Sequence, residues 1–316
     1  MYIILVFIVL YLAEIFYFKI ADKYNVIDKP NERSSHNRIT LRGGGIVFYI
    51  GTLTYFFFSG LQYPWFMIGL TLIAFISFVD DIKTASKYTR LLFHFSALAL
   101  LFYQWNLFSL PWWTLVVALI FCTAIINAYN FMDGINGITG GYSFVALAVL
   151  LYINRYVIKY VDNDLLLAIL ASILVFSSFN FRKKAICFAG DVGSVSIAFI
   201  LLFFMGLLII KTGDFSYIVL LAVYGTDTVL TVIHRLLLRE NISLPHRKHL
   251  YQIMANELKM SHVKVSLIYM AVQAFISIGY FFCISYRYEY LLLILVLLSV
   301  IYVLFMKKYY YLHIAK

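Results

Sequence analysis

The stretch SVSIAFILLFFMGLLIIK, residues 194–211, has a single charged side chain, and that lysine stands at its end. A helix that spans a bilayer needs about 20 mainly apolar residues, so this stretch is long enough to cross a membrane. Ten further apolar runs have the same character. Together they predict eleven transmembrane helices, near 1–20, 44–61, 65–79, 91–108, 112–130, 141–158, 164–180, 194–211, 215–233, 264–286 and 289–306.

The composition supports the same interpretation. Of the 316 residues, 63% are hydrophobic and 13% are charged. Soluble domains are about half apolar and about a quarter charged, so these values exclude a water-soluble fold. Long unbroken apolar runs also argue against a β-barrel, whose strands are short and alternating. We therefore predict an all-α polytopic integral membrane protein, with residues 1–316 forming a single transmembrane domain.

Two smaller features fit this class. The first run, MYIILVFIVLYLAEIFYF, lacks a basic leader and a small-residue cleavage site, which predicts a retained helix and not a signal peptide. Cys122, Cys187 and Cys283 lie in or beside apolar runs without paired or metal-type spacing, so we expect reduced cysteines.

The basic residues predict an orientation. Eleven crossings place the two termini on opposite sides. With the N-terminus outside and the C-terminus cytoplasmic, 21 of the 25 lysines and arginines lie inside, and Arg155, Lys159, Lys211 and Arg287 lie outside. This asymmetry follows the positive-inside rule. An anionic leaflet then accounts for the net charge of +10, and no nucleic-acid partner is needed.

Polar residues of other kinds also gather at the predicted inner side. All seven histidines fall there, together with Asp80, Asp81, Asp133 and Asp191. Topology explains lysines and arginines, but it does not explain histidines and acids flanked by apolar sequence, which are costly at membrane depth and tend to be functional. We expect cytoplasmic chemistry on the loops near 21–43, 80–90, 131–140, 181–193 and 234–263.

Carboxylates stand at two predicted helix ends. VDDIKTASKYTR (79–90) places Asp80 and Asp81 side by side, where a Mg²⁺ ion would offset their repulsion. Adjacent helical positions point about 100° apart, so one of the pair would face a given metal. AGDVGS (189–194) places Asp191 between glycines at a helix start. A solvated helix end for the pair and an N-cap for Asp191 remain open alternatives.

The segment NAYNFMDGINGITGG (127–141) combines a polar stripe with a broken helix. Asn127, Asn130, Asp133 and Asn136 recur every three residues, and several glycines interrupt the helix beside them. Irregular backbone at membrane depth is tolerated where it is buried in protein or lines a wet cavity. A plain turn is the alternative, although a turn needs no polar stripe in the preceding span.

Two inner loops carry cations. DKPNERSSHNRITLRGGG (28–45) contains Arg33, His36, Arg38 and Arg42 before three glycines. HRLLLRENISLPHRKHLYQ (234–252) contains His246, Arg247 and His249. No second ligand pair completes a zinc set, and cationic donors suit phosphate oxygens better. Both loops are also explained by topology alone. Taken together, carboxylates, glycines and cations on one face suit a diphosphate bound with Mg²⁺.

This ordered set resembles the polyprenyl-phosphate N-acetylhexosamine-1-phosphate transferase superfamily. The matching motifs are Asp80-Asp81, the Asn127/Asn130/Asp133-Gly134 block, Gly190 to Ser194 and the histidine-rich last inner loop. HRKHLYQ (246–252) resembles the branch that initiates O-antigen and capsule synthesis. Asn136 and His94 depart from the family pattern, where Asp and Gln are frequent.

The resemblance implies transfer of HexNAc-1-phosphate from a UDP-N-acetylhexosamine to undecaprenyl phosphate at a bacterial inner membrane, with Mg²⁺, or alternatively Mn²⁺, as cofactor. The products would be UMP and an undecaprenyl-diphosphate-sugar that initiates a cell-surface polysaccharide. The sugar, the glycan pathway and a homodimer are left open. The implied catalytic residues are Asp80, Asp81 and Asp191, with Asp81 and Asp191 as metal ligands. The implied substrate-binding residues are Arg42, Lys87, Arg90, Asn127, Asn130, Asp133, His246, Arg247 and His249.

A proton-coupled transporter is the main alternative. It would place charges near the bilayer midplane and show repeat-related broken helices, whereas these acids cluster at one end of their spans and no repeat is visible. Glu14 and Asp227, inside apolar runs, would be the proton carriers in such a protein. A membrane scaffold has no use for four polar motifs on one face.

Overall fold

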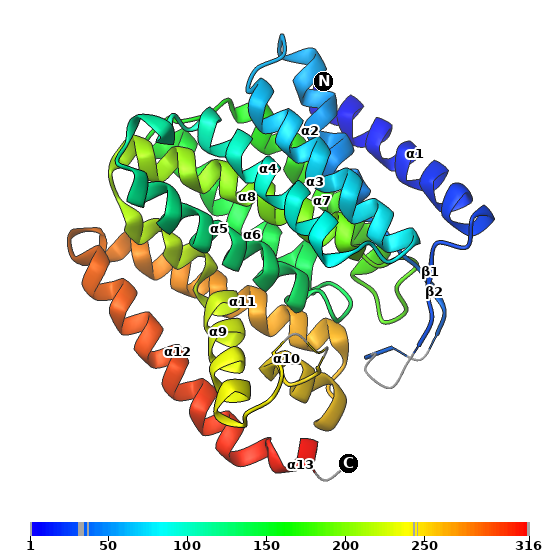
Figure 1. The fold of residues 1–316 in the computed structure, drawn as a ribbon, viewed down its shortest axis with the longest axis vertical. Helices are drawn as coiled ribbons and strands as arrows, with labels where there is room; N and C mark the ends of the chain where they lie inside the picture. The colour runs from blue at the N-terminus through cyan, green and yellow to red at the C-terminus, as the bar shows by residue number, and fades with distance from the viewer. Residues whose placement is uncertain (1, 31–34, 37, 243, 245, 315–316) are drawn as a thin grey trace.

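The computed structural model describes residues 2–30, 35–36, 38–242, 244 and 246–314, and in these residues the fold is helical apart from one short ribbon (Figure 1). The first half contains α1 (Tyr2–Lys23), β1 (Ile27–Asp28), β2 (Thr40–Leu41), α2 (Ile46–Phe58), α3 (Pro64–Ile82), α4 (Lys87–Gln104), η1 (Leu107–Ser109) and α5 (Trp112–Met132). The second half contains α6 (Ile138–Tyr156), α7 (Asn163–Asn180), α8 (Gly190–Thr212), η2 (Phe215–Leu221), α9 (Ala222–Leu237), α10 (Leu250–Gln252), η3 (Ile253–Glu257), α11 (His262–Phe282), η4 (Ile284–Tyr286), α12 (Arg287–Tyr309) and α13 (Tyr311–Ile314).

Every predicted apolar run falls on a helix, which confirms the helical, multi-pass class. Within the described residues, nine helical segments are long and apolar enough to cross a membrane. The two predicted spans outside that set are α2, which is apolar but has 13 residues, and α4, which begins with a polar turn. Eleven crossings and the orientation of the termini therefore stay predictions.

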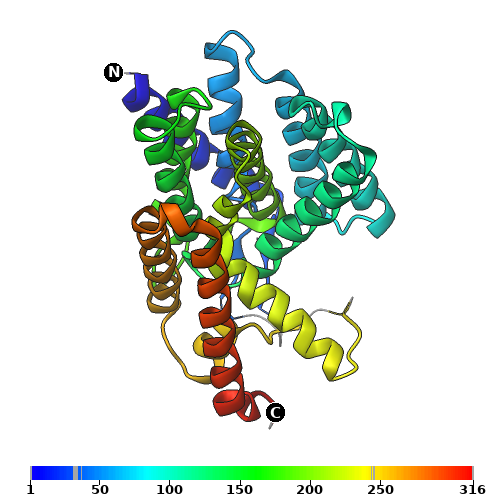
Figure 2. The same cartoon turned by 90° about the vertical axis from the view of Figure 1, so that its left-hand side faces the viewer.

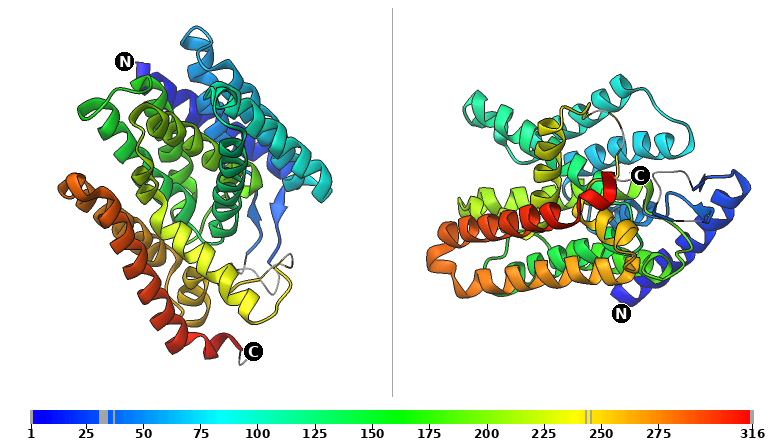
Figure 3. Two further views of the ribbon diagram at one scale, coloured as in Figure 1. Left: turned by 60° about the vertical axis from the view of Figure 1, so that its left-hand side comes forward. Right: turned by 90° about the horizontal axis from the view of Figure 1, so that it is seen from below.

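Helix α8 forms the centre of the bundle, and α1 and α12 lie at opposite borders (Figures 1 and 3). Residues 192–205 of α8 are all buried, because α2, α3, α5 and α6 pack around it. In contrast, α12 is equally apolar but mostly exposed, and it crosses α9 at the edge of the molecule (Figure 2). A helix that is apolar all round suits either a protein core or a lipid environment. Helix α8 is an example of the first and α12 is suited to the second.

Among the described residues, a two-stranded ribbon is the one departure from the predicted all-α fold. Strands β1 and β2 are antiparallel, with Ile27 opposite Leu41 and Asp28 opposite Thr40. The ribbon extends to the segment before α8, because Phe188 N–H donates to Leu41 C=O at 2.8 Å. It lies beside the bundle at the end where α10 is found (Figure 3). This pairing carries the first inner loop against the start of α8.

The starts of α2 and α8 approach each other backbone to backbone. A β-carbon on Gly45 would collide with Cα of Gly193 and would lie 2.9 Å from the carbonyl oxygen of Ala189. Gly44 and Gly45 also donate their N–H groups to Phe188 and Ala189. Glycine is therefore required at this contact, which holds two loops of the site together.

Gly45→Ala is expected to destabilise the protein by about 1–3 kcal/mol, because no flexible side chain is available to move away from the new methyl group. The thermal midpoint of the purified protein in detergent would measure this. Gly225→Ala is the matched control, since a β-carbon there meets no atom within 4 Å. Equal midpoints for the two variants would contradict the packing argument.

Candidate functional site

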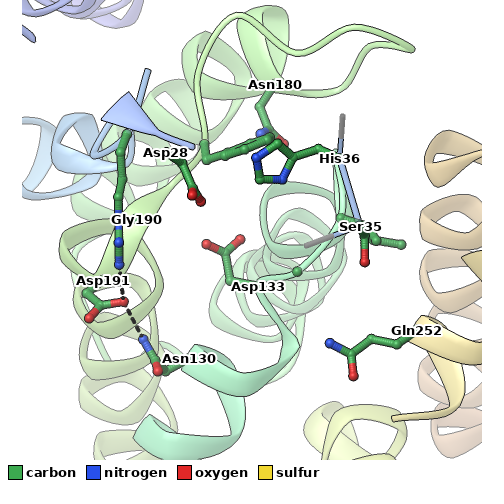
Figure 4. Close-up of a pocket in the computed structure, with 13 residues that line it drawn as sticks. Asp28, Ser35, His36, Asn130, Asp133, Asn180, Gly190, Asp191 and Gln252 are labelled. Atoms are coloured by element: carbon green, nitrogen blue, oxygen red, sulfur yellow. Dashed lines mark hydrogen bonds and ion pairs between the residues drawn. The ribbon is translucent and has the colours of Figure 1, made fainter. Parts of the chain in front are cut away.

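A cavity of about 540 Å³ opens where several helix ends meet (Figure 4). Its walls come from the first inner loop, the ends of α5 and α7, the start of α8, and α10. Aspartate, asparagine and glutamine side chains face into it from these separate segments. The lining residues are Asp28, Ser35, His36, Arg42, Asn130, Asp133, Gly134, Ile135, Asn180, Phe188, Gly190, Asp191 and Gln252.

Asp81 is buried and acts as an external cap of α8. Its carboxylate accepts the backbone N–H groups of Asp191, at 2.8 Å, and Val192, at 3.0 Å. The first N–H groups of a helix have no partner inside the helix, so a carboxylate there is favourable. Arg42 Nε lies 2.6 Å from the same carboxylate. With these contacts Asp81 organises the site and has little capacity left to bind a metal.

Asp191 stands between donors and a second carboxylate. Its Oδ1 accepts Arg42 Nη2 at 3.1 Å and Asn130 Nδ2 at 3.0 Å. The side chains of Asp191 and Asp80 are in contact with each other. Two carboxylates in contact need a proton or a cation between them, because their charges repel. This contact is the feature of the site that fits a divalent cation.

The donor set suits magnesium better than zinc. No group of three or more His, Cys, Asp or Glu side chains is placed to hold a metal within the described parts of the chain. Mg²⁺ is commonly held by one or two carboxylates, with water and substrate phosphate completing its shell. Asp191 and Asp80 would be those carboxylates, whereas the sequence resemblance assigned the second position to Asp81.

Asp80 also joins the α3 end to the start of α4. Arg90 Nη1 lies 2.9 Å from Asp80 Oδ2, and the N–H of Ala85 donates to Oδ1 at 2.6 Å. Lys87, by contrast, is exposed and lies over the ring of Tyr88 at 5.2 Å. Of the two predicted cations on this loop, Arg90 belongs to the carboxylate cluster, and Lys87 has no contact with it in the structure.

The predicted stripe at the end of α5 is divided, because the helix ends at Met132. Asn130 reaches Asp191, and Asp133 lines the cavity beyond the helix end and accepts a hydrogen bond from Thr139 at 2.7 Å. Asn127 is exposed and does not line the cavity. Asn136 is buried and donates to the carbonyl of Arg182 at 2.8 Å, so its role is to link two loops. A single helical stripe was therefore wrong for the residues after Met132.

Burial changes the protonation of Asp133. Desolvation raises the pKa of Asp133 to about 7, although the hydrogen bond from Thr139 acts in the opposite direction. Near neutral pH this carboxyl group therefore exists in both protonation states.

The last inner loop contacts the site by a different residue than expected. His249 is buried beside Asp227, and His246 lies against it with ring centres 5.0 Å apart. Arg247 Nη2 lies 3.8 Å from Glu257. None of these three lines the cavity, but Gln252, one turn later, does. The predicted loop therefore reaches the site, but His246, Arg247 and His249 lie behind the residues that line the cavity.

Several lining residues were missed as site residues. Asn180 carried no signal beyond being polar at a helix end, whereas Asp28, His36 and Gln252 lie in the two loop segments that were singled out for their basic residues. Asn180 holds the wall by accepting Gly137 N–H at 2.7 Å and donating to Cys187 C=O at 2.8 Å. Arg33, expected among the loop cations, lies outside the described residues.

Comparison with known proteins finds a family match in the part of the chain that contains Asp80, Asn130, Asp133 and Asp191. A family model described as Glycosyl transferase family 4 matches residues 63–210. The probable undecaprenyl-phosphate N-acetylglucosaminyl 1-phosphate transferase of Bacillus subtilis (strain 168) is 28% identical over 289 residues, which are 84% of this chain and 78% of that protein.

Two further relatives have related names. The undecaprenyl-phosphate alpha-N-acetylglucosaminyl 1-phosphate transferase of Escherichia coli (strain K12) is 27% identical over 294 residues, covering 83% of this chain and 77% of that protein. The decaprenyl-phosphate N-acetylglucosaminephosphotransferase of Mycobacterium leprae (strain TN) is 23% identical over 216 residues, covering 58% and 54%. The chain is thus similar to proteins that share one reaction type in their names.

Proposed function

We propose that this chain is a phosphoglycosyltransferase that uses undecaprenyl phosphate as acceptor. The family match and the relatives support its membership of the polyprenyl-phosphate N-acetylhexosamine-1-phosphate transferase superfamily. The donor is a UDP-N-acetylhexosamine, and UDP-GlcNAc is the first candidate because the relatives are named for GlcNAc. The products are undecaprenyl-diphosphate-HexNAc and UMP. The observation that carries the proposal is that Asp191 lines the cavity, accepts from both Arg42 and Asn130, and has Asp80 as a neighbouring carboxyl group.

The reaction forms one phosphorus–oxygen bond and breaks another. An oxygen of the lipid phosphate attacks the sugar-linked phosphorus of the donor, and the bridging oxygen leaves with UMP. A phosphate monoester has a second pKa near 6, so the acceptor is about 90% dianion at pH 7 and is already nucleophilic. The main barrier is therefore the approach of two anions, and cationic groups relieve it more than a base would.

The residues of the cavity are suited to that task. Arg42 presents a guanidinium, 32% exposed at its side chain, between Asp81 and Asp191. Arg42 and Arg90 are placed to donate to phosphate oxygens, because each lies at the carboxylate cluster and Arg matches phosphate geometry. When bound at Asp191 and Asp80, Mg²⁺ would supply further positive charge to the diphosphate. Asn130 keeps Asp191 in position from the α5 end.

The proposed location is the cytoplasmic face of a bacterial inner membrane. This proposal is supported by the sequence, because the cavity is lined from loops that the positive-inside rule assigns to the inner face. The substrates agree, because a nucleotide sugar is a cytoplasmic metabolite and a lipid phosphate stays at headgroup depth. The gathering of acids at one end disfavours the transporter alternative, which needs them near the midplane.

The direct test is an assay of the full-length protein in detergent with undecaprenyl phosphate and a panel of UDP-HexNAc donors. We expect UMP release together with a lipid-linked sugar, dependent on both substrates and abolished by EDTA. Re-addition of Mg²⁺ should restore it, and Mn²⁺ should be compared. Donor uptake into sealed vesicles without UMP release would instead support a transporter.

The raised pKa of Asp133 predicts a pH dependence. Below about pH 7 the carboxyl is protonated, and above it the carboxylate can accept hydrogen bonds from the donor substrate. We expect kcat/KM for the donor to rise through pH 7. Asp133→Asn resembles the protonated form, so it should match the wild type near pH 5.5 and fall about tenfold below it near pH 8.5.

The measurement for Asp133 is the ratio of the two kcat/KM values across that pH range. A ratio is needed because ionisation of the acceptor phosphate near pH 6 affects both proteins equally. A ratio that stays constant with pH would show that the Asp133 charge has no part in donor use.

A further inference from the structure

A buried acid in the membrane part of α9 has its partners on the last inner loop, on α11 and on α9 itself, where the hydroxyl of Thr231 donates to Oδ1 of Asp227 at 3.2 Å. Asp227 is 4% exposed. Its Oδ1 accepts the N–H of Leu250 at 2.9 Å, and its Oδ2 accepts the N–H of Tyr251 at 3.4 Å and the hydroxyl of Tyr269 at 2.6 Å. Nδ1 of His249 lies 3.5 Å from Oδ1, an ion-pair distance. These contacts satisfy a carboxylate that would otherwise be costly in an apolar span.

The residues that Asp227 holds lead directly to the cavity. Leu250 and Tyr251 begin α10, whose third residue, Gln252, lines the cavity. The hydroxyl of Tyr251 donates to the carbonyl of Phe131 at 2.9 Å, next to the end of α5 that carries Asp133. One carboxylate therefore fixes the loop at the point where it meets the α5 wall.

The structure leaves little room for this loop to rest elsewhere. A β-carbon on Gly134 would collide with the hydroxyl of Tyr251. The side chain of Gln252 returns to accept the N–H of His249 at 3.2 Å, closing the turn. Both ring nitrogens of His249 are buried without a hydrogen-bond partner among the described residues, and Nδ1 is the one that lies 3.5 Å from Asp227. An acid beside Nδ1 favours the tautomer with its proton there, which leaves Nε2 as an acceptor.

We infer that Asp227 is a positioning residue for the proposed transferase reaction, acting through His249 and the start of α10 to hold the last inner loop against the cavity. The expected change in kcat/KM rests on the proposed function, whereas the expected change in the exchange of the α10 amides does not. It also gives Asp227 a use other than proton transport, since its oxygens accept from two loop amides, a tyrosine and a threonine and lie beside a histidine.

The first test is amide hydrogen exchange in the full-length protein. In Asp227→Asn, a peptide containing Leu250 and Tyr251 should exchange about tenfold faster, the effect of losing one hydrogen bond to a charged group. Asp214→Asn is the matched control. Asp214 is also buried and multiply bonded, but to Ser216, Tyr280 and Arg287, and none of these three residues belongs to the last inner loop. It should leave exchange at α10 unchanged.

The second test is a double-mutant cycle on kcat/KM for UDP-GlcNAc with undecaprenyl phosphate. Asp227→Asn and His249→Ala should each lower kcat/KM by about tenfold or more. Because both act through the same route, the double variant should have a kcat/KM within about twofold of the less active single variant. Asp214→Asn should lower the thermal midpoint without changing kcat/KM. Tyr269→Phe, which removes one donor to the carboxylate, serves if Asp227→Asn does not fold, and should change the same two readouts in smaller degree.

The outcomes separate the two proposals. Faster exchange at α10 with unchanged kinetics in an active enzyme would overturn the positioning role. Multiplied losses in the double variant would overturn the route through His249. Unchanged exchange in both Asp227→Asn and Tyr269→Phe would overturn the anchor itself. A wild type without transferase activity would refute the proposed function alone, because the exchange measurement does not depend on turnover.

Discussion

Replacing Asp191 with asparagine is expected to lower kcat by about a thousandfold at saturating Mg²⁺ and substrates. Asparagine keeps the shape of the side chain and can still accept from Arg42 or Asn130, which lie 3.1 Å and 3.0 Å from Oδ1. It lacks the charge and the second carboxylate oxygen that a cation shared with Asp80 requires. The initial rate of UMP release, titrated with Mg²⁺, measures the loss.

Asp80→Asn is the informative comparison. Asp80 already pairs with Arg90 and accepts the N–H of Ala85, so it is poorly placed to act as a free base. We expect this variant to need more Mg²⁺ and to retain kcat within about tenfold at saturation. If Asp80→Asn abolishes turnover while metal binding is intact, Asp80 is the base and the electrostatic account of catalysis is wrong.

Loss of Arg42 is expected to have the second largest effect. Arg42→Ala should lower kcat/KM by about a hundredfold, because it removes the cation that bridges Asp81 and Asp191 and leaves these two carboxylates without an ion-pair partner. Arg42→Lys should recover less than about tenfold of this loss, since one ammonium cannot reproduce the two-sided contact of a guanidinium. Both are measured as UMP release at low donor concentration.

A second arginine–aspartate pair provides the control for Arg42. Arg287 Nη1 lies 2.5 Å from Asp214 Oδ2, and neither residue lines the cavity. Arg287→Ala should change the thermal midpoint at most slightly, because the arginine side chain is 44% exposed, and should leave kcat/KM unaltered. Equal kinetic losses in Arg42→Ala and Arg287→Ala would point to general destabilisation and against a role of Arg42 in the site.

The order of motifs along the chain was sufficient to find the acidic centre of the site. Asp80, Asn130, Asp133 and Asp191 were predicted from polar residues at apolar helix ends, and the structure brings them together. A chain that crosses a membrane repeatedly returns to the same side at every second crossing. Residues that are far apart in sequence can therefore meet at one set of helix ends, as these four do. The same logic could not find Asp28 or Asn180, because their residue types at loop and helix ends are ordinary.

The roles within the cluster depended on geometry. Asp80 and Asp81 are adjacent and chemically identical, and only the fold shows that Asp81 caps α8 while Asp80 contacts Asp191. Likewise the sequence predicted His249 as a substrate contact, whereas the structure buries it beside Asp227 and gives the cavity wall to Gln252.

By itself the sequence determined that the chain is a multi-pass helical membrane protein with its polar chemistry at one set of helix ends, because length, apolarity and charge bias act locally along the chain. Only the tertiary structure decided that α8 is the buried centre while the equally apolar α12 lies at the border, and which carboxylates meet. Lipid and protein interior are alike in polarity, so apolar composition cannot distinguish them, and side-chain direction depends on packing that composition does not encode.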